Sequence, residues 1–328
     1  MQAAVLRAIN DLAIEEIADP GPPGPNMVRV RMKAAGLCGS DVHYYEHGRI
    51  GDFVLRAPMI LGHEVAGIIE SVGTGVTLPV GVVVALEPGI PCGECELCRR
   101  GDYNLCARVR FFATPPVDGA LTDYVLHPAA YTYVADGLTP EEAALAEPVS
   151  VGVYAVRQAG IRLGTKTAVM GAGPVGVLTA LVAESQGAEV CLRDIRADRV
   201  ESARTMGLQA DLIDAGSESS YDVAIDCSGA EAALTWAIGH LKRGGRLVLV
   251  GLGDEASMQL NGMAIATRGL SVQGIFRYAN TYPAALHVIR THRSRLAPLL
   301  ARRINLAELP QHLSAKRYRE ALKTMVVL

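Results

Sequence analysis

Four cysteines stand close together in the segment PCGECELCRRGDYNLC, as Cys92, Cys95, Cys98 and Cys106. This spacing inside one loop suits four thiolates around a single tetrahedral ion. Zinc fits best, because it accepts sulfur ligands and has no redox chemistry of its own. Four sulfurs leave no open position, so such a zinc is structural. The alternatives are four unrelated loop cysteines, a disulfide pair or an iron–sulfur cluster.

A second group of metal-binding residue types is spread along the chain. Cys38 lies in GLCGSDVHYYEHGRIGDF, His63 and Glu64 lie in LGHEVAG, and Glu147 lies in AEPVSVG. Three protein ligands and one open position describe a reactive zinc. A single cysteine or histidine is more often part of a packed core than a ligand. The residues alone therefore leave this group as a candidate.

The segment GAGPVG places Gly171, Gly173 and Gly176 between an expected strand and an expected helix. In that context the pattern predicts a dinucleotide site. The first glycine makes the turn, the second admits the pyrophosphate, and the third allows the helix to pack closely on the strand. The helix N-terminus would offer its free N–H groups to the phosphates.

Asp194 ends the next expected strand, where an acidic residue holds the ribose hydroxyls. A carboxylate at this place favours NAD and repels the 2′-phosphate of NADP. Arg193, Arg196 and Arg199 crowd the same turn, which leaves some NADP use open.

The elements that would position these residues change character along the chain. Residues 27–36, 64–73 and 81–86 read as strands, and helical periodicity is scarce before about residue 140. Thr139 can cap a helix that begins at Pro140. Strands and helices then alternate, which predicts a parallel sheet with helices on both faces. The expected strands are 167–170, 189–194, 221–229 and 246–253, and the expected helices are 174–187, 198–207 and 231–245.

Composition narrows the class of protein. The chain has 328 residues, half of them hydrophobic, with a net charge of -3 and a pI of about 6.3. This balance gives no reason to expect nucleic acid or an acidic membrane surface as a partner. No run reaches the ~18 apolar residues of a membrane span, and from residues 1–11 we expect no secretory signal. Seven cysteines with clustered metal spacing indicate a reducing compartment, so we expect a cytoplasmic protein.

The order of motifs resembles the medium-chain zinc-dependent dehydrogenases. The motifs are CGSDVHY, GHE, the four-cysteine loop, EPVSVG and GAGPVG, and the segments CGSDVHYYEHGRIGDF, FFATPPVDGALTDY and IFRYANTYP resemble the polyol branch, the sorbitol and xylitol dehydrogenases. The resemblance implies a GroES-like catalytic domain over 1–147 and 277–328 and a Rossmann NAD-binding domain over 148–276. It also implies NAD-dependent oxidation of a polyol to a ketose, one catalytic and one structural zinc, and a homodimer or homotetramer.

The resemblance further assigns roles to single residues. Cys38 and His63 look like zinc ligands, and Glu64 or Glu147 completes the site, directly or through a water. Ser40 would take the substrate proton and His43 would pass it towards solvent. Asp41 resembles the carboxylate that orients a ligand histidine. The set that resembles polyol contacts is Tyr45, Glu147, Arg277 and Tyr278. The set that resembles cofactor contacts is Gly171, Gly173, Val175, Gly176, Asp194, Arg199, Val250, Leu252, Ile275, Phe276 and Arg277.

Three segments depart from the family pattern: an apolar stretch near residue 80, a shortened stretch near 216, and an early end after KTMVVL. Two other functions stay open. One is a zinc dehydrogenase for another secondary alcohol, a small diol or threonine. The other is a non-catalytic nucleotide-binding sensor or structural protein, which predicts a damaged metal triad.

Overall fold

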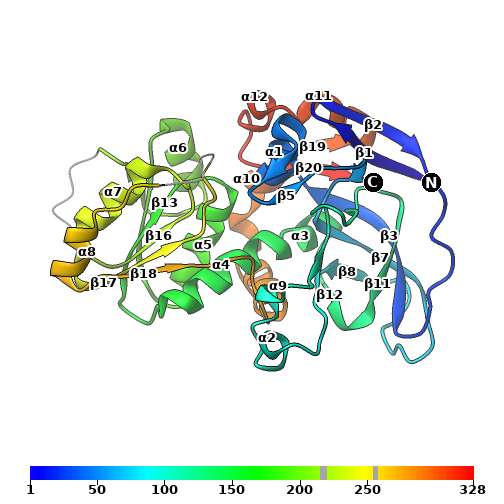
Figure 1. Ribbon diagram of the computed structural model, residues 1–328, viewed down its shortest axis with the longest axis horizontal. Coiled ribbons are helices and arrows are strands. Elements are labelled where there is room, and N and C mark those ends of the chain that lie inside the picture. Colours follow the sequence, from blue (N-terminus) through cyan, green and yellow to red (C-terminus); the bar gives the residue numbers. More distant parts are fainter. Residues whose placement is uncertain (215–219, 254–257) are drawn as a thin grey trace. The chain divides into compact units, whose positions relative to one another are not determined.

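The computed structural model describes residues 1–214, 220–253 and 258–328, so the shortened stretch near 216 lies outside the described residues. It divides into two compact units (Figure 1), Met1–Glu147 with Leu299–Leu328 and Pro148–Pro298. Residues 277–298, which the sequence assigned to the first domain, belong to the second unit.

Two contacts explain this difference at the boundary. Arg157 Nη1 donates to the carbonyl of Asn280 at 2.7 Å, and Arg295 Nη2 pairs with Glu184 Oε2 at 2.8 Å. Between these anchors, helix α9 (Tyr282–Thr291) buries an apolar face that includes Leu286. The polar anchors and the buried face fasten this stretch to the second unit.

The first unit is built on a seven-stranded, mostly antiparallel sheet, which confirms the expected β-rich character. The strands are β3 (Met27–Gly36), β7 (Glu64–Val72), β8 (Val83–Leu86), β11 (Tyr124–Pro128), β12 (Thr132–Val134), β19 (Arg302–Asn305) and β20 (Thr324–Val327). Strand β3 lies at the centre and pairs with β7, β11 and β20. The C-terminal strand β20, red in Figure 1, therefore lies beside a strand from near the N-terminus.

Smaller elements complete this unit. The further strands are β1 (Gln2–Ala8), β2 (Asp11–Glu16) and β6 (Met59–Ile60) in one sheet, β4 (Arg49–Ile50) with β5 (Phe53–Val54), and β9 (Gly89–Ile90) with β10 (Arg110–Phe111). The helices are α1 (Gly39–His47), α2 (Glu96–Arg99), α3 (Pro140–Ala144), α11 (Leu309–His312) and α12 (Ala315–Tyr318), with 3-10 turns at Tyr103–Leu105, Ala129–Tyr131 and Leu306–Glu308. Helix α3 begins as predicted, with a reciprocal cap between Thr139 and Glu142.

The second unit holds a six-stranded sheet in which all neighbouring strands are parallel, with helices beside it (Figure 1). The order β15-β14-β13-β16-β17-β18 confirms the doubly wound dinucleotide fold. The strands are β13 (Lys166–Met170), β14 (Glu189–Asp194), β15 (Ala210–Leu212), β16 (Tyr221–Asp226), β17 (Leu241–Leu249) and β18 (Ser271–Gly274). The helices are α5 (Pro174–Ser185), α6 (Ala197–Thr205), α7 (Glu231–His240) and α8 (Gly262–Arg268) besides α9.

Two helices span the boundary of the units in sequence, α4 (Ala146–Ala159) and α10 (Ala297–Leu300), and a 3-10 turn covers Arg293–Arg295. The helix expected over 231–245 ends early, at His240. Leu241 is already extended and pairs with Tyr221, and Gly244 has a φ of +76°. Glycine is a poor helix former, so strand pairing prevails over helical continuation there.

Each unit has its own buried core. In the first, Val30, Met32 and Leu86 pack from the sheet, and in the second, Met170 and Leu247 do so. None of the helices within 1–214, 220–253 and 258–328 combines the length and apolarity that a membrane crossing requires.

Candidate metal centres and dinucleotide site

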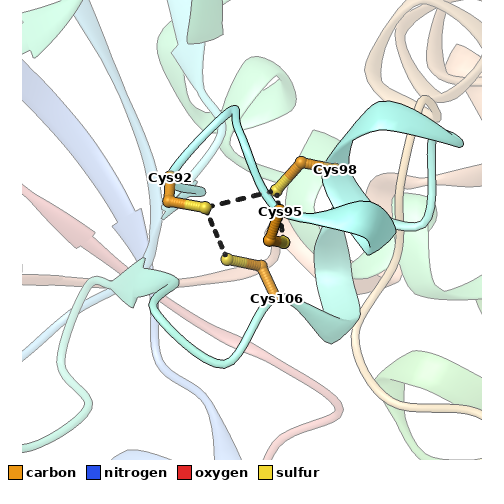
Figure 2. A group of neighbouring side chains, drawn as sticks. All are labelled: Cys92, Cys95, Cys98 and Cys106. Carbon is orange, nitrogen blue, oxygen red and sulfur yellow. Dashed lines mark hydrogen bonds between the residues drawn. The ribbon is translucent and has the colours of Figure 1, made fainter.

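The four cysteines of the loop point their sulfurs into a common space (Figure 2). The S···S distances are 3.4 Å for Cys95–Cys98, 3.6 Å for Cys92–Cys106 and 3.8 Å for Cys92–Cys98. A tetrahedral zinc with bonds of about 2.3 Å separates its sulfurs by roughly 3.8 Å. These residues therefore fit a closed zinc site. All four are free thiols, which argues against the disulfide alternative.

Local groups prepare one of these sulfurs for a metal. Backbone N–H groups of Glu94 and Cys95 lower the pKa of Cys92 to about 6. Arg108 Nη2 donates to the Cys92 sulfur at 3.3 Å. Burial and the neighbouring Cys95 instead raise the pKa of Cys98 to about 12. These surroundings favour the thiolate of Cys92, and a metal must displace the proton of Cys98.

A buried carboxylate fastens this loop to the sheet below it. Glu87 is 1% exposed and follows β8 directly. Its Oε1 accepts a hydrogen bond from Tyr103 at 2.7 Å, and its Oε2 accepts one from Tyr133 at 2.9 Å. Tyr103 belongs to the four-cysteine loop and Tyr133 to β12. Both carboxylate oxygens are therefore used in holding the loop in place.

Cys38, His63 and Glu64 form a second cluster, with their donor atoms all within 4.8 Å of one another. Cys38 precedes helix α1 as its N-cap residue, and Glu64 begins strand β7. His63 and Glu64 are buried, whereas Cys38 is half-buried. One sulfur, one nitrogen and one carboxylate oxygen converge here, which fits a metal site with a position left open. The structure thus brings together three of the four residues that the sequence singled out.

Asp41 lies beside this cluster, on the first turn of α1. Its Oδ2 accepts the N–H of Cys38 at 2.9 Å, and its Oδ1 accepts the N–H of Gly62 at 3.3 Å and lies 3.8 Å from His63 Nδ1. Burial disfavours protonation of His63, but Cys38 and Asp41 outweigh it and raise its pKa to about 10. That proton must leave before the ring can bind a metal, so metal binding here releases a proton.

Glu147 is buried on the first turn of α4, near enough for its charge to raise the pKa of His63. It does not belong to the group whose donor atoms lie within 4.8 Å. Ser40, His43 and Tyr45 all lie on α1, and the rings of His43 and His47 are 4.7 Å apart.

The glycine-rich turn has the conformation that the sequence predicted. Gly171 has a φ of +95°, and a Cβ at Gly176 would collide with the carbonyl of Gly171. A Cβ at Gly173 would meet nothing within 4 Å, so the backbone is open there to a phosphate. Gly173 caps α5, and Pro174 occupies its first turn without cost.

The carboxylate of Asp194 is bound on both sides by backbone. Its Oδ2 accepts the N–H of Ala172 at 2.6 Å, and its Oδ1 accepts that of Arg196 at 2.8 Å. Each oxygen keeps a further lone pair for a ribose hydroxyl. The arginines nearby are already engaged: Arg193 donates to the carbonyl of Leu212 at 3.1 Å, and Arg196 pairs with Asp198 at 2.5 Å.

The chain is similar to known proteins over nearly its full length. A family model described as "Alcohol dehydrogenase GroES-like domain" matches residues 24–136, and one described as "Zinc-binding dehydrogenase" matches 174–291. Sorbitol dehydrogenase of Gallus gallus is 40% identical, over 99% of this chain and 95% of that protein. The human sorbitol dehydrogenase is 42% identical, over 92% and 88%. This chain is a zinc-binding dehydrogenase of the medium-chain polyol branch. Its cofactors are NAD and zinc.

A solved structure agrees with the fold of this zinc-binding dehydrogenase. The L-idonate 5-dehydrogenase of Escherichia coli superposes with a TM-score of 0.92 at 28% identity, over 100% of this chain and 98% of that one. The resemblance read from the motifs is therefore confirmed for family, fold and cofactors.

The other predicted residues of this zinc-binding dehydrogenase lie in the second unit. Val175 is on α5, Arg199 is buried on α6, and Val250 and Leu252 follow β17. Residues 275–278 follow β18. In that segment the N–H of Ile275 donates to the carbonyl of Leu249. The guanidinium of Arg277 lies 4.6 Å from the ring centroid of Phe276, and Tyr278 is buried.

Sequence reasoning missed three residues that shape the metal centres of the dehydrogenase. Glu87 supports the four-cysteine loop, and the ring of Phe111 lies 5.9 Å from that of His63. Lys323 is a buried cation in contact with Glu64. Only Lys323 left a signal in the sequence, as a charged residue that opens the apolar run TMVV.

Proposed function

We propose that this dehydrogenase oxidises a secondary hydroxyl of a sugar alcohol of the sorbitol or xylitol type to a ketone, with hydride transfer to NAD. The cluster of Cys38, His63 and Glu64 carries the proposal, because three unlike donors within 4.8 Å suit a reactive zinc. A sensor or structural protein would not need this triad intact. The 40–42% identity to sorbitol dehydrogenases supports a polyol as the substrate.

When bound, zinc supplies a Lewis acid for the hydroxyl oxygen and NAD supplies the hydride acceptor. In this assignment Cys38, His63 and Glu64 hold the zinc, and Glu147 is an acidic neighbour that faces the substrate. The choice of Glu64 over Glu147 as ligand is supported by its place in the cluster.

Proton removal is assigned to helix α1. Ser40 takes the hydroxyl proton, and His43 passes it towards solvent. Residues three apart on a helix lie on the same face, and both side chains are half-buried, which supports a relay between them. Tyr45, Glu147, Arg277 and Tyr278 are the proposed polyol contacts, since several hydroxyls need several polar partners.

The cofactor is assigned to the glycine-rich turn and its surroundings. The phosphates bind at the open backbone of Gly173 and the N-terminus of α5, and Asp194 holds the ribose. Val175, Arg199, Val250, Leu252, Ile275, Phe276 and Arg277 complete the proposed contacts. The pairing of Arg196 with Asp198 supports a preference for NAD, because that guanidinium is already neutralised.

We also propose a homodimer or homotetramer in the cytoplasm. The family resemblance supports the assembly, and seven free thiols support a reducing compartment. Sedimentation of the purified protein would test the assembly.

A substrate screen tests the proposal. Xylitol, sorbitol, galactitol, small diols and threonine are compared with NAD and with NADP, and zinc per chain is measured alongside. We expect the highest kcat/KM for a five- or six-carbon polyol with NAD, and two zinc ions per chain. Turnover of diols or threonine alone would point to the other alcohol dehydrogenases, and a higher kcat/KM with NADP would contradict the role of Asp194.

A further inference from the structure

Lys323 is a fully buried cation, with only 2% of its surface exposed. Lysine is almost never buried to this extent unless it is paired. Its Nζ forms an ion pair with Glu64 Oε2, and it donates a hydrogen bond to the carbonyl of Leu37 at 3.2 Å. Leu37 directly precedes Cys38. One ammonium group thus connects the two chain segments that carry the proposed ligands.

The sheet explains how a residue near the C-terminus reaches this place. Gly36, at the end of β3, pairs with Glu64 of β7 on one side and with Met325 of β20 on the other. Lys323 immediately precedes β20. A Cβ at Gly36 would collide with Glu64 Oε2 and lie 2.8 Å from Lys323 Cε. The missing side chain of Gly36 is therefore what makes room for the ion pair.

The charges around the cluster are unbalanced without this lysine. Cys38, Glu64, Asp41 and Glu147 can each be negative, and Lys323 interacts electrostatically with three of them, Glu64, Cys38 and Glu147. A divalent ion with this many negative neighbours in a buried site loses much of its attraction for a substrate oxygen, because charges interact strongly at low dielectric. An ammonium group in the same site offsets part of that excess.

We propose that Lys323 is a positioning residue of the reactive metal site, which occupies one carboxylate oxygen of Glu64 and leaves the other for the metal. Glu64 then has one oxygen for the metal. The positive charge of Lys323 also offsets part of the negative charge that the ligands would place on the metal. This inference rests on the proposed assignment of Cys38, His63 and Glu64 as ligands. Lys323 itself needs no contact with substrate.

The test compares zinc affinity and kinetics in Lys323→Met, Lys323→Arg and a matched control. Lys316→Met is that control, because Lys316 is an exposed lysine on α12 of the same C-terminal segment. Zinc affinity is measured by chelator competition on the zinc-loaded protein, and kcat and KM are measured across pH. The zinc that remains bound in a Cys38→Ser variant is the zinc of the four-cysteine loop, and it is subtracted to obtain the reactive zinc.

We expect Lys323→Met to hold the reactive zinc at least as tightly as the parent, because a positive neighbour is removed. Its kcat should fall by at least about tenfold with a smaller change in KM, and its kcat–pH profile should move to higher pH. Lys323→Arg should restore most of the kcat, and Lys316→Met should match the parent. Lys323→Gln carries the same expectations if the methionine variant does not fold.

Weaker zinc binding together with an unchanged kcat–pH profile would reduce Lys323 to a structural residue and overturn the proposal. If the Cys38→Ser variant instead keeps both zinc ions, the ligand assignment itself is wrong. Failure of the Lys323 proposal and failure of the ligand assignment are therefore distinguishable.

Discussion

The two metal centres of the protein are built in opposite ways. The four-cysteine centre comes from one loop, residues 92–106, and three of its four sulfur-bearing residues are only half-buried. The second cluster comes from the segments around residues 38 and 63, at the ends of strands β3 and β7, and His63 and Glu64 are buried. A closed site can be encoded locally, whereas a site with an open position has to be assembled and kept dry.

The charged residues beside the two centres also differ in burial. Arg108 beside Cys92 is well exposed and also pairs with Glu94 at 2.7 Å, so solvent screens its effect. Lys323 beside Glu64 is buried, where a single charge acts strongly. We therefore expect activity and zinc binding to be less sensitive to changes around the loop centre than to changes around the assembled centre.

The largest expected effect is on activity at the assembled centre. Cys38→Ser should lose one of two zinc ions per chain and lower kcat/KM by roughly 1000-fold or more, because Lewis-acid stabilisation is worth several kcal/mol. Cys106→Ser should also lose one zinc, but it should lower the melting temperature and keep most of the kcat/KM. Equal loss of activity in the two variants would break the contrast between the centres.

A buried histidine of the first unit should affect the pH dependence of stability. His127 is fully buried, donates its Nε2–H to the backbone carbonyl of Tyr131 at 3.2 Å, and packs on Phe112. Burial lowers its pKa to about 4, from an ordinary value of 6.5. Below pH 6.5 the unfolded chain takes up a proton that the folded chain refuses, so stability falls as the pH drops from 6.5 towards 4.

The loss attributable to His127 should reach roughly 3 kcal/mol across that window. Urea unfolding between pH 4 and pH 7, in buffer with excess zinc, should show a shallower pH dependence for His127→Gln than for the parent. Parallel curves for the two proteins would show that His127 contributes nothing to the acid sensitivity.

A smaller effect is expected from the carboxylate next to the assembled centre. Asp41→Asn keeps the size of the side chain but can accept only one of the two backbone hydrogen bonds, from Cys38 and Gly62. Zinc affinity at the reactive site should fall by about 10- to 100-fold, as for other groups that orient ligands. Chelator competition measures this, and the zinc of the four-cysteine loop serves as the internal control. Unchanged affinity would leave Asp41 a helix cap only.

Much of the fold was predictable because its signals are local. Strands β3, β7 and β14 follow the predicted ranges closely, and α3 begins at the capped Pro140. The glycine pattern of residues 171–176 identified the dinucleotide turn, since each glycine stands where the backbone conformation or a close approach excludes a side chain. The errors arose where packing decided: α7 ends at His240, and α9 joins the second unit through Arg157 and Arg295.

By itself the sequence determined the four-cysteine centre, the glycine turn and the family, because their residues lie within short stretches whose spacing sets their geometry. Only the tertiary structure decided that Cys38, His63 and Glu64 converge while Glu147 stays outside their group. It also decided that Lys323 lies against Glu64. Strand pairing across the central strand β3 brings these distant residues together, and spacing along the chain cannot reveal such a neighbour.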